Sequence, residues 1–154
     1  IPGTISDDKI MNIDFAPTLL DFAGLSIPEE MQGRSFKNTF TKNSDTKRNA
    51  VYYHYYEYPI WHNVQPHYGV RTDKYKLIHF YYSMDEWELY DMDADPHEMN
   101  NIYENADPGL ISKLKFKLDS LKKYYGDTSS INDMISMTDT VIQRVYNEPV
   151  KEIK

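Results

Sequence analysis

The sequence contains no cysteine, which excludes disulfide bridges, zinc–thiolate sites, iron–sulfur clusters and a thiol nucleophile. Basic residues are few: 17 Lys and Arg stand against 24 Asp and Glu, which gives a formal net charge of −7. Nucleic-acid-binding domains normally carry a basic surface, so this balance argues against a nucleic-acid partner. No apolar run reaches the ~18 residues of a membrane-spanning helix, so we expect no membrane partner either.

The chain also lacks an initiating methionine and a basic-then-apolar leader, since it opens with Ile1-Pro2-Gly3. Such a start is typical of a mature protein or of a piece cut from a longer one. The length of 154 residues suits one domain of ordinary size. A chain of this length buries about 68–70% of its unfolded surface, which is enough for a hydrophobic core that needs no disulfide or structural metal.

Apolar periodicity predicts an α+β fold. A helix is expected over residues 14–24, with Asp14 as N-cap, and a long helix over 108–125, capped by Asp107. Four aromatic and β-branched runs predict an antiparallel four-stranded sheet packed against the long helix, with strands at 50–58, 68–72, 75–82 and 87–92. Residues 127–154 form a separate extension, with a hint of a further helix near Val141–Tyr146.

Aromatic residues are concentrated at the start of the predicted sheet. The chain has 14 tyrosines. Six aromatic residues fall within ten positions: Tyr52, Tyr53, Tyr55, Tyr56, Tyr58 and Trp61. Their rings suit stacking on sugars, and tyrosine hydroxyls add hydrogen bonds at a wet rim. Alternating aromatics are also typical of a half-buried strand, and for any single tyrosine this is the more common role.

Three histidines accompany the aromatic residues, at His54, His62 and His67. Their spacing matches no standard metal pattern, so a metal site is a weak interpretation. His67 lies four residues before Arg71, and an imidazole with a guanidinium suits an anionic oxygen cluster such as a sulfate, phosphate or carboxylate. Alternatively, Arg71 pairs with Asp73 or another carboxylate at the sheet edge.

Motifs for nucleophilic or metal-dependent catalysis are missing. The sequence has no Gly-x-Ser-x-Gly and no glycine-rich phosphate loop. The run Asp91-Met92-Asp93-Ala94-Asp95 has the alternate spacing of a calcium loop, but it lacks the glycine and the closing glutamate of that loop. A turn cap is the better interpretation of Asp95.

Four segments together resemble the type I, formylglycine-dependent sulfatases, in the order of that family. Residues 13–24, IDFAPTLLDFAG, resemble its D-x-x-P-T-L-L-D-x-A-G helix, and residues 32–36, QGRSF, resemble the x-G-x-S segment that follows. Residues 68–78, YGVRTDKYKLI, are similar to its R-T-D-R-Y-K-L-I hairpin. Residues 88–102, ELYDMDADPHEMNNI, are similar to its E-L-Y-D-L…D-P-x-E-x-x-N-L closing motif.

The resemblance implies the C-terminal part of a bacterial arylsulfatase-like hydrolase. It assigns 1–49 to the end of an alkaline-phosphatase-like α/β catalytic domain and a connecting loop, 50–126 to the C-terminal subdomain, and 127–154 to an extension. Sulfatases of this family use a formylglycine, made from Cys or Ser in C/S-x-P-S/A-R, and a calcium ion. The sole Ser-x-Pro here, Ser26-Ile27-Pro28, continues with Glu29. Formylglycine, calcium and catalytic bases are therefore expected before Ile1, no catalytic or metal residue is assigned here, and the fragment alone is expected to be inactive.

The resemblance leaves substrate recognition for this part of the chain. The family's C-terminal subdomain leans over the active-site cleft, so the expected partners are the missing catalytic domain and a sulfated carbohydrate. The predicted substrate-binding residues are His67, Arg71, Tyr56, Trp61 and His62. By resemblance, the enzyme degrades glycans and is periplasmic or secreted. The alternative is a stand-alone carbohydrate-binding or structural interaction module.

Overall fold

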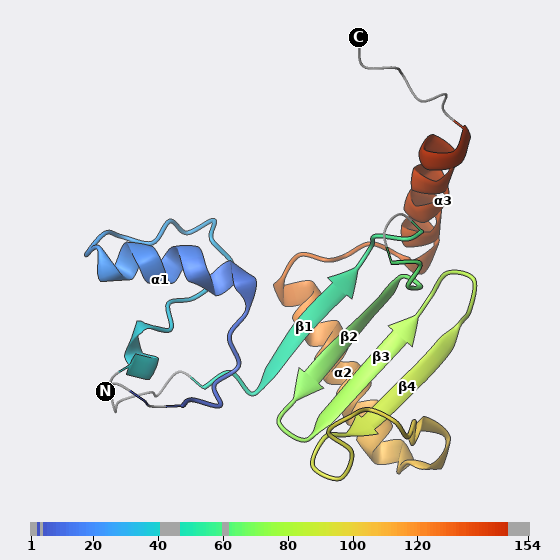
Figure 1. The fold of residues 1–154 in the computed structure, drawn as a ribbon, viewed down its shortest axis with the longest axis horizontal. Coiled ribbons are helices and arrows are strands. Elements are labelled where there is room, and N and C mark those ends of the chain that lie inside the picture. The colour runs from blue at the N-terminus through green and yellow to red at the C-terminus, as the bar shows by residue number, and fades with distance from the viewer. Residues whose placement is uncertain (1–2, 4, 41–46, 60–61, 148–154) are drawn as a thin grey trace. The chain divides into compact units, whose positions relative to one another are not determined.

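The structure is a computed structural model that describes residues 3, 5–40, 47–59 and 62–147. The chain divides into two compact units, 1–51 and 52–154, and Figure 1 shows the elements of each. Among the described residues, no helix has both the length and the apolar composition needed to cross a bilayer.

The first unit contains one short α-helix and two 3-10 turns. The turn η1 (Asn12–Asp14) leads directly into α1 (Phe15–Phe22), and η2 (Lys37–Phe40) follows a long loop. Aromatic contacts join the segment after α1 to the helix: the ring centroids of Phe15 and Phe36 are 5.5 Å apart, and those of Phe22 and Phe40 are 5.7 Å apart. The α1 surface nevertheless stays apolar and open, with Phe15 56%, Leu19 68% and Phe22 55% exposed.

The second unit is built on the predicted four-stranded sheet, whose strands follow one another in chain order (Figure 1). Its strands are β1 (Ala50–Tyr55), β2 (His67–Thr72), β3 (Tyr75–Phe80) and β4 (Glu86–Asp91). The antiparallel register places Val70 opposite Leu77, and Leu77 opposite Leu89. These three side chains have no exposed surface, so they form the centre of the core.

Helix α2 (Pro108–Tyr124) covers one face of the sheet, as predicted (Figure 1). It begins at Asp107, whose carboxylate accepts a 2.8 Å hydrogen bond from the Leu110 amide, and Pro108 occupies the first turn, where its missing N–H costs nothing. Leu114 and Leu118 are buried against the sheet. Since side chains alternate along a strand, Tyr52, His54, Tyr68 and His79 lie on this helix-covered face.

The extension contains a longer helix than the sequence hint, α3 (Ile131–Asn147). Its first turn is fixed by a reciprocal capping box. The Ser130 amide donates to Asp133 Oδ2 at 3.0 Å, and the Asp133 amide donates to Ser130 Oγ at 3.1 Å. The Ser-x-x-Asp spacing is the local signal that would have moved the predicted start back to residue 131.

Candidate functional site

Most of the predicted substrate-binding residues gather where β1 ends and β2 begins, a region that we call the loop end of the sheet. Tyr56 follows the last residue of β1, His62 lies in the connection, and His67 is the first residue of β2. Trp61 belongs to the same connection but lies outside the described residues. The loop end is close to α3, because the Tyr58 ring lies 5.5 Å from Tyr82, whose hydroxyl donates to Asp139 at 2.6 Å.

His67 is wedged among aromatic rings on the face of the sheet opposite α2. Tyr55 stacks on it at 5.5 Å with an interplanar angle of 20°, and Phe80 lies 5.0 Å away. Its Nδ1 lies 2.8 Å from the Gln65 carbonyl oxygen, which can only accept, so Nδ1 carries the hydrogen. In the neutral ring Nε2 is then an acceptor, and in the charged ring it is a donor.

Gly69 makes room for a neighbouring side chain and not for a ligand. A Cβ at this position would lie 2.5 Å from the Leu77 carbonyl oxygen and 2.6 Å from the Tyr53 hydroxyl. The space above Gly69 is therefore filled by the Tyr53 side chain. The missing side chain at Gly69 lets Tyr53 pack flat on the sheet, and it opens no room for a ligand.

Arg71 lies at the other end of β2, four residues or about 13 Å along the strand from His67. Its Nη1 donates to the carbonyl oxygens of Thr72 and, at 2.8 Å, of Asp73. The guanidinium thus braces the turn between β2 and β3. The structure thus places Arg71 and His67 at opposite ends of β2, and their joint binding of an anion stays a prediction.

Tyr56 and His62 are the exposed members of the predicted set among the residues that the structure describes. Tyr56 is 52% exposed, and one face of its ring stacks on His54 at a centroid distance of 3.8 Å. His62 is exposed in the connection. Tyr56 continues the β1 alternation on the side of Tyr52 and His54, whereas His67 lies on the opposite side. The loop end therefore offers an aromatic ring on one side and an imidazole on the other.

A buried network beneath Tyr56 was not anticipated from the sequence. His54 Nδ1 lies 3.0 Å from Asp127 Oδ2, and His54 Nε2 lies 3.0 Å from the Tyr81 hydroxyl. Tyr52 also donates its hydroxyl to Asp127. Burial lowers the pKa of His54 below 6.5, and the hydrogen bond to Asp127 offsets this only in part. The two-residue spacing of Tyr52 and His54 predicts a shared face, but nothing local points to Asp127.

A second histidine on the same face is held in a similar way. His79 Nε2 lies 2.7 Å from Asp85 Oδ1, and His79 Nδ1 lies 2.8 Å from the Tyr68 hydroxyl. Burial lowers the pKa of His79 as well, and the hydrogen bond that His79 donates to Asp85 offsets this only in part. The His79 ring stacks on the Trp87 ring at a centroid distance of 4.1 Å. The Lys115 ammonium lies 4.0 Å from the centroid of the Trp87 ring, so both rings are covered. The Trp87 ring is therefore in contact with side chains of the protein itself and is not open for stacking on a sugar.

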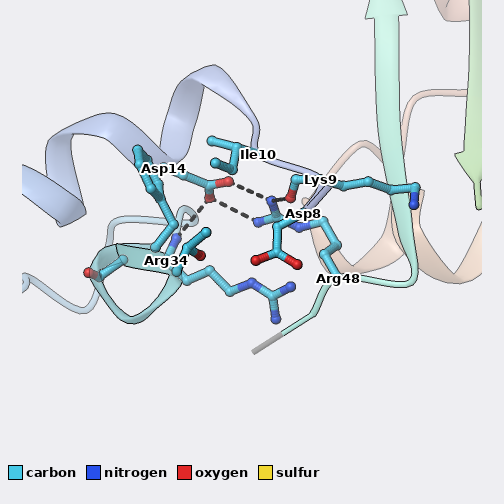
Figure 2. A pocket seen from close by; sticks show the side chains of 9 residues that line it. Asp8, Lys9, Ile10, Asp14, Arg34 and Arg48 are labelled. Carbon is cyan, nitrogen blue, oxygen red and sulfur yellow. Dashed lines mark hydrogen bonds and ion pairs between the residues drawn. The ribbon is translucent and has the colours of Figure 1, made fainter. Parts of the chain in front are cut away.

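The first unit contains a small polar pocket around Asp14 and Arg48 (Figure 2). Arg48 Nη1 and Nη2 donate to the two Asp14 oxygens at 2.5 and 2.9 Å, and the amides of Met11 and Arg34 donate at 2.7 and 3.0 Å. Burial works to raise the pKa of Asp14, but these hydrogen bonds and the Arg48 charge outweigh it and lower the pKa below 3.8. Asp14 lies at the N-cap position of α1 as predicted, but its carboxylate is engaged by these donors and makes no capping bond in α1.

The described residues do not fit the calcium ion or the formylglycine that the sequence resemblance implies for a full-length enzyme. Among the described residues, no group of three or more His, Cys, Asp and Glu side chains is arranged to hold a metal ion. The calcium-like run is a turn: Asp91 Oδ1 accepts from the Asp93 amide at 3.1 Å, and Asp95 Oδ2 accepts from the Asn100 amide at 2.8 Å. The turn-cap interpretation of Asp95 is confirmed.

Comparison with known proteins identifies the family. The sequence model of the family described as N-sulphoglucosamine sulphohydrolase, C-terminal, matches residues 1–124. An N-acetylglucosamine-6-O-sulfatase of Bacteroides thetaiotaomicron is 50% identical over 129 residues, which are 81% of this chain and 23% of that protein. The N-acetylglucosamine-6-sulfatase of Bos taurus is 29% identical over 157 residues, covering 82% of this chain and 28% of that protein.

The fold agrees with these relatives. A solved protein in complex with its substrate, D-glucosamine-2-N,6-O-disulfate, has 49% sequence identity and a TM-score of 0.74, and the match covers 79% of this chain and 25% of that one. The chain thus spans about a quarter of the length of the relatives it matches. The matched helix, hairpin and closing motif, together with the four-stranded sheet on its helix, show that this chain belongs to the C-terminal family of the sulfatases.

Proposed function

We propose that the chain is the C-terminal part of an enzyme that hydrolyses sulfate esters of glycosaminoglycan-type sugars, with a 6-O-sulfated glucosamine unit as its substrate. The observation that carries this proposal is the 50% identity to an N-acetylglucosamine-6-O-sulfatase over most of this chain. A protein solved with a glucosamine disulfate as its substrate supports the same sugar. Hydrolysis adds water across the ester: either the S–O or the C–O bond of the bridging oxygen breaks, and the products are hydrogen sulfate and the sugar with a free hydroxyl group.

In this proposal the chain recognises the sugar and does not supply the nucleophile. His67 and His62 provide imidazole nitrogens for sugar hydroxyls, and the open face of Tyr56 stacks on the ring. Trp61 lies in the same connection. Arg71 remains part of the proposed set, but its contacts with the Thr72 and Asp73 carbonyls favour bracing of the turn. The Arg71→Ala variant distinguishes the roles: a turn brace lowers the melting temperature and leaves kcat/KM unchanged.

Formylglycine and calcium belong, in this proposal, to the part of the enzyme that the matched relatives have before this region. The side chains of the present chain fit neither group, so no step of the reaction is derived through them here. The partner of the chain is then its own catalytic domain, and the exposed α1 residues are a natural contact surface for it. We also place the enzyme in the periplasm or outside the cell, where sulfated glycans are met.

The test compares the full-length enzyme with the 154-residue chain. Each is incubated with N-acetylglucosamine-6-sulfate, and released sulfate is measured by ion chromatography. We expect sulfate from the full-length enzyme and none from the chain alone, because the chain has no nucleophile. A full-length enzyme that is silent on 6-O-sulfated and 2-O-sulfated sugars alike would refute the sulfatase proposal. Tight sugar binding by the isolated chain would instead support the carbohydrate-binding module.

A further inference from the structure

The turn between α2 and α3 places a carboxylate under the loop end of the sheet. Asp127 lies three residues beyond the region that the family's sequence model matches, and 73 residues along the chain from His54. It nevertheless contacts two inward side chains of β1, accepting from Tyr52 and from His54. The turn is therefore tied directly to β1, the strand that ends one residue before Tyr56.

The hydrogen bonds fix the proton on His54. Burial works to raise the pKa of Asp127, but hydrogen bonds from Tyr52 and His54 outweigh it and lower the pKa below 3.8, so the carboxylate is ionised and only accepts. Nδ1 of His54 must then carry the hydrogen. Nε2 is the acceptor for the Tyr81 hydroxyl. Held at both nitrogens, the imidazole has one ring plane and one tautomer.

The fixed imidazole is the surface on which Tyr56 rests. The two rings lie 3.8 Å apart with an interplanar angle of 28°, and the His54 side chain is only 4% exposed. Tyr56 itself is 52% exposed, so its second face looks outward at the loop end. A rotation of His54 would remove the surface on which the Tyr56 ring stacks, and with it the contact that holds this ring in one orientation.

Helix α3 packs against Tyr81, the residue that bonds His54 Nε2. Met134 and Thr138 are 2% and 5% exposed, and the Thr138 hydroxyl lies beside Tyr81. The Tyr82 hydroxyl donates to Asp139. The extension thus encloses the partner of His54 Nε2 as well as supplying the partner of Nδ1.

The charged and titratable groups around His54 favour its neutral form. Lys122 of α2 and His67 of β2 disfavour a positive charge on the His54 ring, whereas Asp127 favours it. The Lys122 ammonium lies 4.0 Å over the Tyr68 ring, which is 5.5 Å from His54. Its other neighbours include the hydroxyls of Tyr52 and Tyr81 and the ring of Tyr56.

We infer that Asp127 and His54 are positioning residues that orient Tyr56 for stacking on the substrate sugar, so that the turn after α2 tunes sugar selectivity. This inference rests on the proposed role of Tyr56 in sugar recognition. It assigns a function to a segment outside the matched family region, and it separates selectivity for the sugar from cleavage of the sulfate ester.

The test uses two substrates and the full-length enzyme. N-acetylglucosamine-6-sulfate offers a sugar ring to Tyr56, whereas 4-nitrophenyl sulfate does not. Tyr56→Ala should lower kcat/KM for the sugar sulfate about 3- to 10-fold, the worth of one lost stacking contact. Asp127→Ala should lower it by a similar factor, and both should leave kcat/KM for the aryl sulfate unchanged. The double variant should fall no further than Tyr56→Ala alone.

Two controls separate positioning from stability. Asp127→Asn keeps an oxygen that can accept from His54 and Tyr52, so it should retain most of the sugar selectivity. Asp85→Ala removes the carboxylate of the matched pair with His79, which lies away from Tyr56, and should change neither substrate. The melting temperature of each variant shows how much of the enzyme is folded.

Each other outcome overturns a defined part of the reasoning. An equal fall for both substrates in Asp127→Ala, or an equal effect of Asp85→Ala, would mean that the network only stabilises the fold. A fall in Tyr56→Ala without one in Asp127→Ala would overturn the positioning inference and leave the proposed sugar contact intact. No effect of Tyr56→Ala would overturn both inferences about Tyr56. If the wild-type enzyme releases no sulfate from any sugar, the proposed function fails. NMR then decides whether His54 carries its proton on Nδ1, and a proton on Nε2 would overturn the network itself.

Discussion

Removal of the Arg48 side chain is the sharpest perturbation of the first unit. Arg48 and Asp14 are joined by two charged hydrogen bonds of 2.5 and 2.9 Å, with side chains only 9% and 2% exposed. In Arg48→Ala the Asp14 carboxylate stays buried and keeps only the two amide donors. Breaking one partner of a buried pair costs about 3–5 kcal/mol, because a desolvated charge is left uncompensated.

The assay follows the segments that Asp14 holds. Hydrogen exchange is measured on peptides that contain the Met11 and Arg34 amides, and the free energy of unfolding is measured by urea titration with circular dichroism. We expect faster exchange at both amides and a loss of about 3–5 kcal/mol in Arg48→Ala. Arg48→Lys should lose less, since it keeps the charge but gives up the two-pronged contact.

A matched variant isolates the pair. Arg71→Ala also removes a guanidinium, but one that contacts backbone carbonyls of a turn, so exchange at Met11 and Arg34 should be unchanged. If Arg48→Ala lies within about 0.5 kcal/mol of the wild type, as a surface substitution does, Asp14 and Arg48 do not form the buried pair described here.

Other consequences concern pH, packing and exposed surface. The pKa values of His54 and His79 lie below 6.5 in the folded chain, so the unfolded chain binds more protons as the pH falls. The free energy of unfolding should therefore be highest above about pH 6.5 and decrease as the pH drops below it. In a pH series of urea titrations His54→Phe should show a shallower decrease than the wild type, and an unchanged slope would refute this. Gly69→Ala should cost at least about 2 kcal/mol, because its Cβ would meet the Leu77 carbonyl and Tyr53 at 2.5–2.6 Å; a neutral effect on the melting temperature would contradict the close packing. The isolated chain should bind a hydrophobic dye through the open α1 surface, and a dye-silent monomer would favour a stand-alone module.

Local patterns predicted the fold well because they are encoded within a few residues. Strand alternation placed β2, β3 and β4 to within a residue or two, and Asp107-Pro108 marked the start of α2. The β1 strand ends at Tyr55 and not at Tyr58, since its last aromatic residues turn away into the connection. The start of α3 depended on a capping box that is equally local and was overlooked.

The candidate site was harder to predict because its contacts join distant segments. Asp14 meets Arg48 across 34 residues, and His54 meets Asp127 across 73. No spacing rule connects such pairs, since they depend on how helices and strands pack. The same reason explains Arg71: a four-residue spacing in a strand puts two side chains on one face but about 13 Å apart, whereas in a helix it would have made them neighbours.

The central claim, that the loop end of the sheet reads the substrate sugar, is tested most directly by His67→Ala in the full-length enzyme. The measurement is kcat/KM for N-acetylglucosamine-6-sulfate relative to 4-nitrophenyl sulfate. Loss of a hydrogen bond to a sugar hydroxyl, which leaves that hydroxyl unpaired in the site at a cost of about 1–3 kcal/mol, predicts a fall of roughly 5- to 150-fold for the sugar sulfate, with the aryl sulfate retained. An unchanged ratio, whether both values persist or both collapse together, would contradict the account.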